Sequence, residues 1–547
     1  MFNNEKILVT YNGEHIETSV NQVVCNIVNG EDVLAVKINN EVHSIYYKLT
    51  QDSVCEPITY YSAEGERIYA RSLKFLLLMV CHKLYPDLKL EFTNKIGRDY
   101  LVKTSGEIKK EDVKTIKKEM KKLVKAKLPI TKMKVNFETA KQIYTSMNSI
   151  EQLENFKIKI KETFTFYECE GYYNYLYGLI VPNTSYIKGF DIVKFKKDNT
   201  LVLVLPSQDD INVVDTKINP NKVYKEFGKF KEFSAIIGIN NVADINANVL
   251  NGSIGKIIRY SEAEQDRRLI NTVQSIVKKG DVKVVFIAGP SSSGKTTFSQ
   301  RLAEQLKLDG KNSIPLAMDN YFQDEEFIPR DANGEYDFEN VDNVDVELFE
   351  KQVLDMLSVK EVEVPEYNFK EHKKEYKGRK ILLGKNDILI VEGIHALNPV
   401  ISDKLDKSKL FKIYIAPLLT LGYDNYTKVS SNDTRLLRRI VRDSQARSVS
   451  AEQTLKMWKK VRAGEEKNIF PYVKEADVIY NTSLIYEVGV LKAFAENLLL
   501  NVDSTSSYYS DARRLYKMLQ NFRTIETAEI PLNSIIKEFV GKGCFYR

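Results

Sequence analysis

A glycine-rich segment in the second half of the chain holds the residues with the most definite chemistry. It has the sequence Gly-Pro-Ser-Ser-Ser-Gly-Lys-Thr-Thr at residues 289–297, after the apolar run 282–288 and before a helical pattern through Phe298, Leu302 and Leu306. Glycines let backbone amides turn toward phosphate oxygens, and the N-terminus of the following helix faces the same charge. A strand, this loop and a helix are together typical of a P-loop. The sequence therefore predicts a nucleotide site.

The polar residues of this loop have expected roles. Lys295 is expected to reach the β- and γ-phosphates, and Thr296 to offer its hydroxyl to Mg²⁺. Ser293 and Thr297 are expected to add hydrogen bonds. The residues predicted to bind the nucleotide are Gly289, Ser291, Ser292, Ser293, Gly294, Lys295, Thr296 and Thr297.

Two carboxylates follow later strand-like runs and indicate what happens to the phosphate. The run 314–318 leads into Asp319, and the run 388–391 leads into Glu392. In open α/β sheets the carboxyl ends of the strands lie beside the phosphate site. Asp319 could there accept the proton of an attacking hydroxyl, and Glu392 could hold Mg²⁺ directly or through water. A base beside a P-loop favours a kinase over a nucleotide switch.

The elements that must position these groups alternate along the chain. From residue 282 to about 500, apolar strands alternate with helical stretches, which is typical of a mostly parallel sheet with helices on both faces. A connecting helix is predicted over 260–279, ending at Gly280. The tail, 501–547, has the pattern of helices interrupted at Pro531.

The first half has a different pattern. Strands are predicted at 7–11 and 33–38, and a helix at 69–85 that stops at Pro86. A second helix after Gly106 has an apolar stripe and a lysine-rich opposite face, which we interpret as solvated; the alternative is a surface that contacts a polyanion. The fold class is thus multidomain, α/β and α+β.

Length and composition limit the other possibilities. At ~100–200 residues per domain, 547 residues correspond to roughly three or four domains. The 80 Lys and Arg against 74 Asp and Glu leave +6, too little to mark a dedicated nucleic-acid binder. No apolar run near the N-terminus is long enough to cross a membrane, and no secretory signal is visible, so we expect a cytoplasmic protein. Five scattered cysteines and five histidines make a disulfide framework or a zinc site improbable.

Six segments in order, across residues 283 to about 490, resemble the uridine kinase and phosphoribulokinase family. Besides the P-loop they are Asp319-Asn320-Tyr321-Phe322, Tyr336-Asp337-Phe338 with Asp342 and Asp345, Pro365 to Phe369 with His372, Val391-Glu392-Gly393-Ile394, and Asp433 to Asp443. The resemblance implies an ATP- or GTP-dependent, Mg²⁺-requiring kinase with a small-molecule nucleoside as acceptor. It implies that Asp319 is the general base on the 5′-hydroxyl.

The resemblance also implies roles for residues that their own patterns would leave in a core or on a surface. It places Asp342 on ribose hydroxyls and the base among Tyr367, Phe369 and His372. It assigns three arginines to a lid that closes on the phosphates: Arg438 and Arg442 as catalytic residues with Lys295, and Arg439 as a substrate-binding residue.

Three departures from the family pattern concern the acceptor. Asn340-Val341-Asp342 stands in place of His-Pro-Asp, Lys373-Lys374 in place of Ser-Arg, and Asp443 to Ser448 lacks Arg-Gly-Arg. Uridine or cytidine is therefore a preference. The alternative acceptor is another sugar-like molecule, as in the phosphoribulokinase branch.

The first half has its own resemblances. Residues 1–60 are similar to the TGS module, a β-grasp domain, and 61–225 to the second, editing-type domain of threonyl-tRNA synthetase, through Ala70 to Leu77, Lys83 to Pro86, the helix 111–128 with Pro129, and Gly178 to Thr184. Where that domain needs two histidines, then a cysteine and a histidine, this chain has Arg71, Phe75, Leu176 and Ile180. An editing hydrolase is thus not expected, and a scaffold, an oligomerisation surface or a regulatory site remains.

These resemblances give the expected organisation. We predict a TGS-like domain at 1–60, a degenerate editing-like domain at 61–225, a connecting segment at 226–280, the kinase at 281–500 and a helical extension at 501–547. A homo-oligomer is expected. The contrasting function is a nucleotide-regulated protein whose first half binds RNA.

Overall fold

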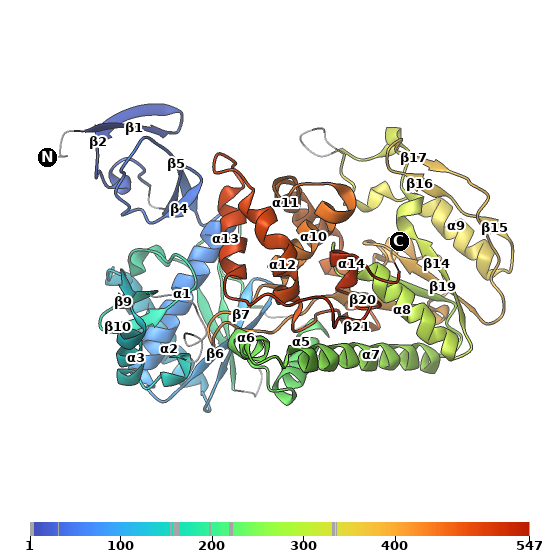
Figure 1. Ribbon diagram of the computed structural model, residues 1–547, viewed down its shortest axis with the longest axis horizontal. Coiled ribbons are helices and arrows are strands. Elements are labelled where there is room, and N and C mark those ends of the chain that lie inside the picture. Colours follow the sequence, from blue (N-terminus) through green and yellow to red (C-terminus); the bar gives the residue numbers. More distant parts are fainter. Residues whose placement is uncertain are drawn as a thin grey trace.

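The computed structural model describes residues 5–30, 32–153, 156, 163–195, 199–217, 222–330, 334 and 336–545 (Figure 1). The chain begins with a five-stranded sheet of order β2-β1-β5-β3-β4, in which only β1 and β5 are parallel. Positive φ at Asn12 and Gly13 forms the tight turn of the first hairpin. The strands are β1 (Lys6–Tyr11), β2 (Glu14–Ser19), β3 (Val33–Ile38), β4 (Glu41–His43) and β5 (Ser53–Thr59). The predicted strands at 7–11 and 33–38 are confirmed.

A long buried helix, α1 (Ala63–Leu84), organises the next region. Ser62 caps it, and its apolar residues form one core with the sheet β11-β12-β7-β6 and with helix α2. The helix predicted at 69–85 is confirmed and starts earlier. The other elements are β6 (Leu90–Ile96), β7 (Asp99–Thr104), α2 (Lys110–Lys125), β8 (Thr131–Val135), α3 (Phe137–Ser146), β9 (Phe164–Cys169), β10 (Tyr172–Tyr175), β11 (Asp191–Lys194) and β12 (Thr200–Val204).

Three helices lead to the second half of the chain along one side of the molecule (Figure 1). They are α5 (Lys222–Ile236), α6 (Val242–Leu250) and α7 (Ile254–Lys279). The predicted connecting helix is about the last three-quarters of α7, which ends at Gly280 with φ +98°. No described helix is long and apolar enough to span a bilayer.

The second half is built on a five-stranded, fully parallel sheet of order β14-β19-β13-β20-β21. Along the central strand, Val285 and Ile287 face one core and Val284 and Phe286 the other, so the sheet is buried on both faces. The predicted parallel sheet with flanking helices is confirmed. The strands are β13 (Val284–Ala288), β14 (Asn312–Ala317), β19 (Asp387–Glu392), β20 (Leu410–Ala416) and β21 (Val478–Asn481).

The flanking helices include the C-terminal tail. Ile535, Ile536 and Phe539 belong to the same core as β13, so the tail packs into the kinase region rather than apart from it. The helices are α8 (Lys295–Leu308), α9 (Val346–Leu357), α10 (Ser431–Arg447), α11 (Ala451–Asn468), α12 (Glu487–Leu500), α13 (Tyr509–Leu519) and α14 (Lys537–Val540). Two short strand pairs lie beyond the sheet: β15 (Val362–Glu363) with β18 (Lys380–Ile381), and β16 (Glu366–Asn368) with β17 (Lys373–Glu375).

Candidate active site

The ends of three adjacent strands bring the predicted phosphate-transfer residues to one edge of the sheet. In the register of the sheet, Glu392 pairs with Ile287 of β13 and with Ala317 of β14. The P-loop follows the first of these strands and Asp319 the second, within the 3-10 turn η4 (Met318–Tyr321). Because all three strands are parallel, their carboxyl ends share this edge.

Close packing explains the two glycines of the P-loop. A Cβ at Gly289 would lie 2.3 Å from the carbonyl oxygen of Ile415. Gly294 has φ +92°, and a Cβ there would lie 2.7 Å from Cγ2 of Ile535. Only glycine combines that dihedral with that contact.

Lys295 begins helix α8 and lies among carboxylates. Its Nζ donates to the carbonyl of Gly289 at 3.0 Å. Burial lowers the pKa of Lys295, and the negative charges of Glu392, Asp319 and Glu538 act in the opposite direction. The ammonium is thus held at the P-loop, facing the two carboxylates predicted from the strand ends and a third from the tail.

The predicted base and the predicted metal ligand both lie in this recess. Asp319 is accessible to solvent, yet the surrounding protein raises the pKa of its carboxyl by desolvation, against the attraction of Lys295. Burial also raises the pKa of Glu392 to about 7, against the same lysine. An accessible carboxylate opposite the P-loop lysine is suited to taking a proton from an acceptor hydroxyl.

The environment of Glu392 fits a magnesium ion. Its Oε2 lies 3.5 Å from the Ser299 hydroxyl, one turn along α8 from Thr296, so the carboxylate adjoins the turn that carries the predicted hydroxyl ligand. Two oxygen ligands beside a phosphate site are the donor set that Mg²⁺ takes in nucleotide enzymes. Glu392 and Thr296 would hold it.

A carboxylate that the sequence analysis missed also faces this site. Burial, and next repulsion from Glu465, raise the pKa of Glu339 to about 7, while the positive charges of Arg439 and Lys295 act in the opposite direction. Its backbone is fixed against α11, because Asn468 donates to its carbonyl at 2.7 Å. The sequence feature that could have predicted its role is its position directly after the family segment Tyr336-Asp337-Phe338.

Asp342, predicted to bind ribose, lies in a short 3-10 turn, η6 (Val341–Asn343). It is exposed, and its backbone amide donates to Asn340 at 3.1 Å within a 3-10 turn. No contact with Lys295 or Asp319 is seen among the described residues. Its role stays a prediction, and Glu339, three residues earlier, is the carboxylate near the P-loop.

The residues predicted to surround the base come together in an aromatic cluster. The Tyr367 and Phe369 rings lie 5.1 Å apart, and each contacts Phe322, at 5.6 and 6.1 Å. His372 stacks on Phe338 at 5.6 Å. The cluster is hydrogen-bonded to η4, the turn that carries Asp319, because the Tyr367 amide donates to the Asn320 side chain at 3.3 Å. Phe369 is 56% exposed, so part of the cluster is open to a ligand.

Of the predicted lid arginines, Arg438 has an internal position. It is completely buried, donates to Glu487 at 2.6 Å and to the carbonyl of Thr482 at 3.0 Å, and reaches the carbonyls of Ser292 and Ser293. These contacts brace the back of the P-loop. Its predicted catalytic role is untested.

Arg439 and Arg442 lie nearer the phosphate side. Both pair with the buried Asp443, at 3.2 and 3.0 Å, and Arg439 also donates to the Ser291 hydroxyl at 2.9 Å. The positive charge of Arg442 contributes to lowering the pKa of Lys295, so it lies close to that ammonium. Nearby arginines can neutralise phosphate charge.

Two carboxylates of this chain accept hydrogen bonds from amides at the P-loop. Glu538 in α14 accepts from the Thr297 amide at 3.0 Å, and the buried Glu465 accepts from the Ser291 amide at 3.1 Å. Thr297 lies in the first turn of α8, whose free amides are the usual seat of an anion. The hydroxyls of Ser292 and Ser293 are buried without a partner in the described part of the chain. No motif signalled Glu538.

Comparison with known proteins agrees with this geometry. The model of the phosphoribulokinase/uridine kinase family matches residues 284–484. Uridine kinase of Staphylococcus aureus (strain Newman) is 31% identical over 198 residues, 36% of this chain and 86% of that protein. Uridine kinase of Ligilactobacillus salivarius (strain UCC118) is 29% identical over 198 residues, 36% of this chain and 83% of that protein.

Among solved structures, a possible uridine kinase from Bacillus stearothermophilus aligns with 40% of this chain and all of its own, at 20% identity and a TM-score of 0.27. A putative fructose transport system kinase from Silicibacter sp. TM1040 aligns with 39% of this chain and 98% of its own, at 17% identity and a TM-score of 0.28. The resemblances of residues 1–225 stay predictions. Through residues 284–484, the chain belongs to the phosphoribulokinase/uridine kinase family, and it is an ATP-dependent kinase with an alcohol acceptor.

Proposed function

We propose that the chain is a nucleoside kinase that transfers the γ-phosphoryl group of ATP or GTP to the 5′-hydroxyl of uridine or cytidine. The observation that supports this most is that Asp319 and Lys295 act on each other electrostatically, beside an aromatic cluster. A kinase needs a base, a phosphate-binding cation and a surface for the acceptor, and these three lie along η4 and the P-loop.

The chemistry assigned to the chain's own residues is proton transfer and charge neutralisation. Asp319 accepts the proton of the 5′-hydroxyl as that oxygen attacks the γ-phosphorus. Lys295, with Arg439 and Arg442, stabilises the charge on the transferring oxygens, which is the main requirement of phosphoryl transfer. Bound Mg²⁺, held by Thr296 and Glu392, would neutralise phosphate charge.

The aromatic cluster and Glu339 support a nucleoside as acceptor. The ring of Phe369, which is exposed and packs against the buried ring of Tyr367, offers a stacking surface to a base. The charges of Asp319 and Lys295 act on Glu339, which supports Glu339 as an acceptor of hydrogen bonds from sugar hydroxyls beside Asp319. A phosphorylated sugar would leave the aromatic surface without a partner.

An acceptor panel tests the proposal. The full chain with ATP and Mg²⁺ is incubated with uridine, cytidine, adenosine, guanosine or ribulose 5-phosphate, and ADP release is followed. We expect turnover with the pyrimidine nucleosides. Turnover with ribulose 5-phosphate alone would refute the nucleoside assignment.

The Asp319→Asn variant tests the base. Because general-base catalysis contributes roughly 10²–10⁴, kcat should fall by about 10² or more while ATP binding is retained. Asp309→Asn, at the exposed far end of α8, is the matched control and should leave kcat unchanged. An unchanged kcat in Asp319→Asn would remove this residue from the mechanism.

A further inference from the structure

A large cavity lies between the first half of the chain and the kinase region, away from the aromatic cluster. It has a volume of about 880 Å³ and is lined by α1, the β6–β7 turn, residues 175–179, the loop before α10, and α13. This volume is within the range of small-molecule sites, about 300–1,000 Å³. Arg71 and Leu176, two of the four positions compared with the editing site, line it, whereas Phe75 and Ile180 are buried in the core beside it.

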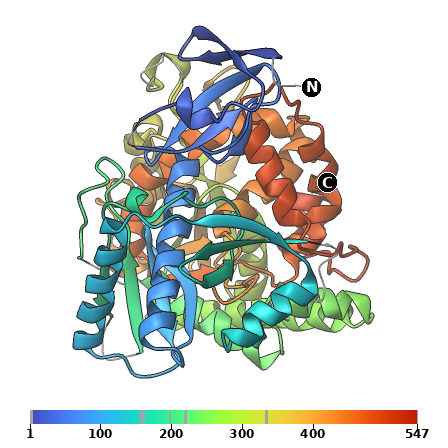
Figure 2. The ribbon, with the colours of Figure 1, turned by 90° about the vertical axis from the view of Figure 1, so that its left-hand side faces the viewer.

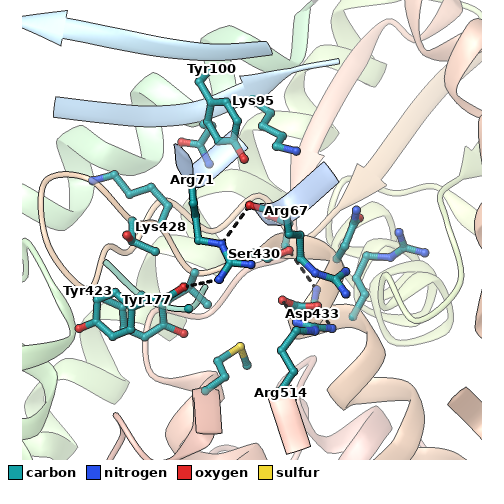
Figure 3. A pocket seen from close by; sticks show the side chains of 18 of the residues that line it. Arg67, Arg71, Lys95, Tyr100, Tyr177, Tyr423, Lys428, Ser430, Asp433 and Arg514 are labelled. Carbon is teal, nitrogen blue, oxygen red and sulfur yellow. Dashed lines mark hydrogen bonds and ion pairs between the residues drawn. The ribbon is translucent and has the colours of Figure 1, made fainter. Parts of the chain in front are cut away.

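The lining is strongly cationic. Ten lysine and arginine side chains and three carboxylates face the cavity. Some cations are neutralised: Arg71 pairs with Glu64 at 3.1 Å. Arg514 pairs with Asp433 at 2.7 Å (Figure 3). Lys74, Arg513 and Lys517 form no ion pair within 4 Å in the part of the chain that the structure describes. The cavity therefore has positive charge that this chain does not balance.

Lys74 is the least expected of these cations. It is on α1, only 8% exposed, and its Nζ donates to the carbonyl of Tyr426 at 3.1 Å and lies 3.8 Å from the ring centre of Tyr100. Burial first, and then the neighbouring charge of Lys95, lower the pKa of Lys74 to about 7, while the negative charge of Asp424 acts in the opposite direction. Burying a lysine that has no carboxylate within 4 Å in the described part of the chain destabilises the fold. A bound anion would supply the missing counter-charge.

One wall of the cavity is aromatic. The Tyr177 and Tyr423 rings lie 4.6 Å apart, side by side in Figure 3. Tyr423 is 6% exposed, and its hydroxyl has no hydrogen-bond partner among the described residues. A buried hydroxyl without a partner points to a missing polar ligand group. Flat rings beside cations are suited to a ligand that has both a ring and phosphate.

We propose that this cavity is a second ligand site, which binds an anionic small molecule of nucleotide size, with its phosphate near Lys74 and Lys517 and its ring near Tyr177 and Tyr423. The cavity reaches the P-loop only at Pro290, and its lining does not include Lys295, Asp319 or Glu392, so the proposal does not depend on which nucleoside is the acceptor. It uses the first half of the chain, for which the kinase reaction has no need.

Calorimetric titration of the full chain tests the site. Lys295→Ala is the background, because it weakens phosphate binding at the P-loop. The probes are UMP, AMP, inorganic triphosphate and a short single-stranded oligonucleotide. We expect a mononucleotide to bind this protein, more tightly than inorganic triphosphate does. Binding of the oligonucleotide alone, or of no probe at millimolar concentration, would overturn the proposal.

Two further substitutions in this background locate the binding. Lys74→Met and Lys517→Gln should each weaken mononucleotide binding about tenfold or more, as expected for the loss of a charged hydrogen bond. Lys456→Met, on the exposed face of α11, is the control and should bind normally. Lys517 is exposed, so its substitution tests the site even if Lys74→Met folds poorly. Unchanged affinity in Lys517→Gln and in folded Lys74→Met would place the ligand elsewhere.

Discussion

The carboxylate of Glu538 lies where the α8 amides would receive a phosphate, and this predicts a competition. Its Oε2 accepts from the Thr297 amide at 3.0 Å, and its charge also acts on Lys295. A nucleotide must displace this contact before its own phosphate can use the amide. A hydrogen bond to a charged group contributes about 1.5–3 kcal/mol and one to a neutral group about 0.5–1.5 kcal/mol.

Glu538→Gln keeps the shape and the neutral hydrogen bond but removes the charge. The difference, about 1–1.5 kcal/mol, corresponds to roughly tenfold tighter ADP binding. Titration calorimetry with ADP measures it, and Glu526→Gln, an exposed carboxylate of the same tail, is the control. An unchanged or weaker affinity in Glu538→Gln, with an unaltered melting temperature, would show that this carboxylate does not compete with phosphate.

Three other predictions follow from buried charges. Arg438→Met should lower the free energy of unfolding by roughly 3–5 kcal/mol, measured in urea, because it leaves the charge of Glu487 buried and unpaired. Arg442→Met should lower it far less, because Asp443 still pairs with Arg439 and Arg447. In the native chain, the KM for the nucleoside should fall as pH rises through about 7, because the Glu339 carboxylate ionises there. Glu339→Gln should raise this KM and abolish its pH dependence. Asp342→Asn is the comparison and should change the KM little. Lys74→Met should raise the stability without ligand, by at most about 5 kcal/mol, most below pH 7. The sign follows from the lowered pKa: between about 7 and 10.4 the unfolded state binds more protons, so native stability rises with pH and the advantage of methionine shrinks. An advantage that grows with pH would contradict this.

The edge of the parallel sheet that carries the P-loop, Asp319 and Glu392 could be predicted because each of these features is defined by a short sequence pattern. A glycine-rich loop between strand and helix, and carboxylates directly after apolar runs, define positions that a parallel sheet brings together by geometry alone. Lys295, Asp319 and Glu392 needed no long-range information. The aromatic cluster around Tyr367 required a family resemblance, since such rings are otherwise assigned to a core.

The remaining features depend on contacts between distant segments. The Thr297 amide and Glu538 are 241 residues apart, and the helical pattern of 431–447 does not reveal that Arg438 turns inward to Glu487. The basic cavity is lined by residues of α1, α10 and α13. The apolar periodicity of a helix predicts that helix by itself, but not which other helices it meets. Charge balance across such surfaces is a property of the assembled fold.

The tail's return to the P-loop has a consequence for how the chain becomes an enzyme. Ile535 lies against Gly294, and the helices α13 and α14 contribute side chains to the core that includes β13. The red C-terminal helices lie against the rest of the chain (Figures 1 and 2). A fragment ending near residue 500 would contain every family motif and still lack this cover, leaving apolar surface that favours aggregation. We therefore expect that the smallest active fragment of this protein is longer than residues 284–484, the part that matches the family.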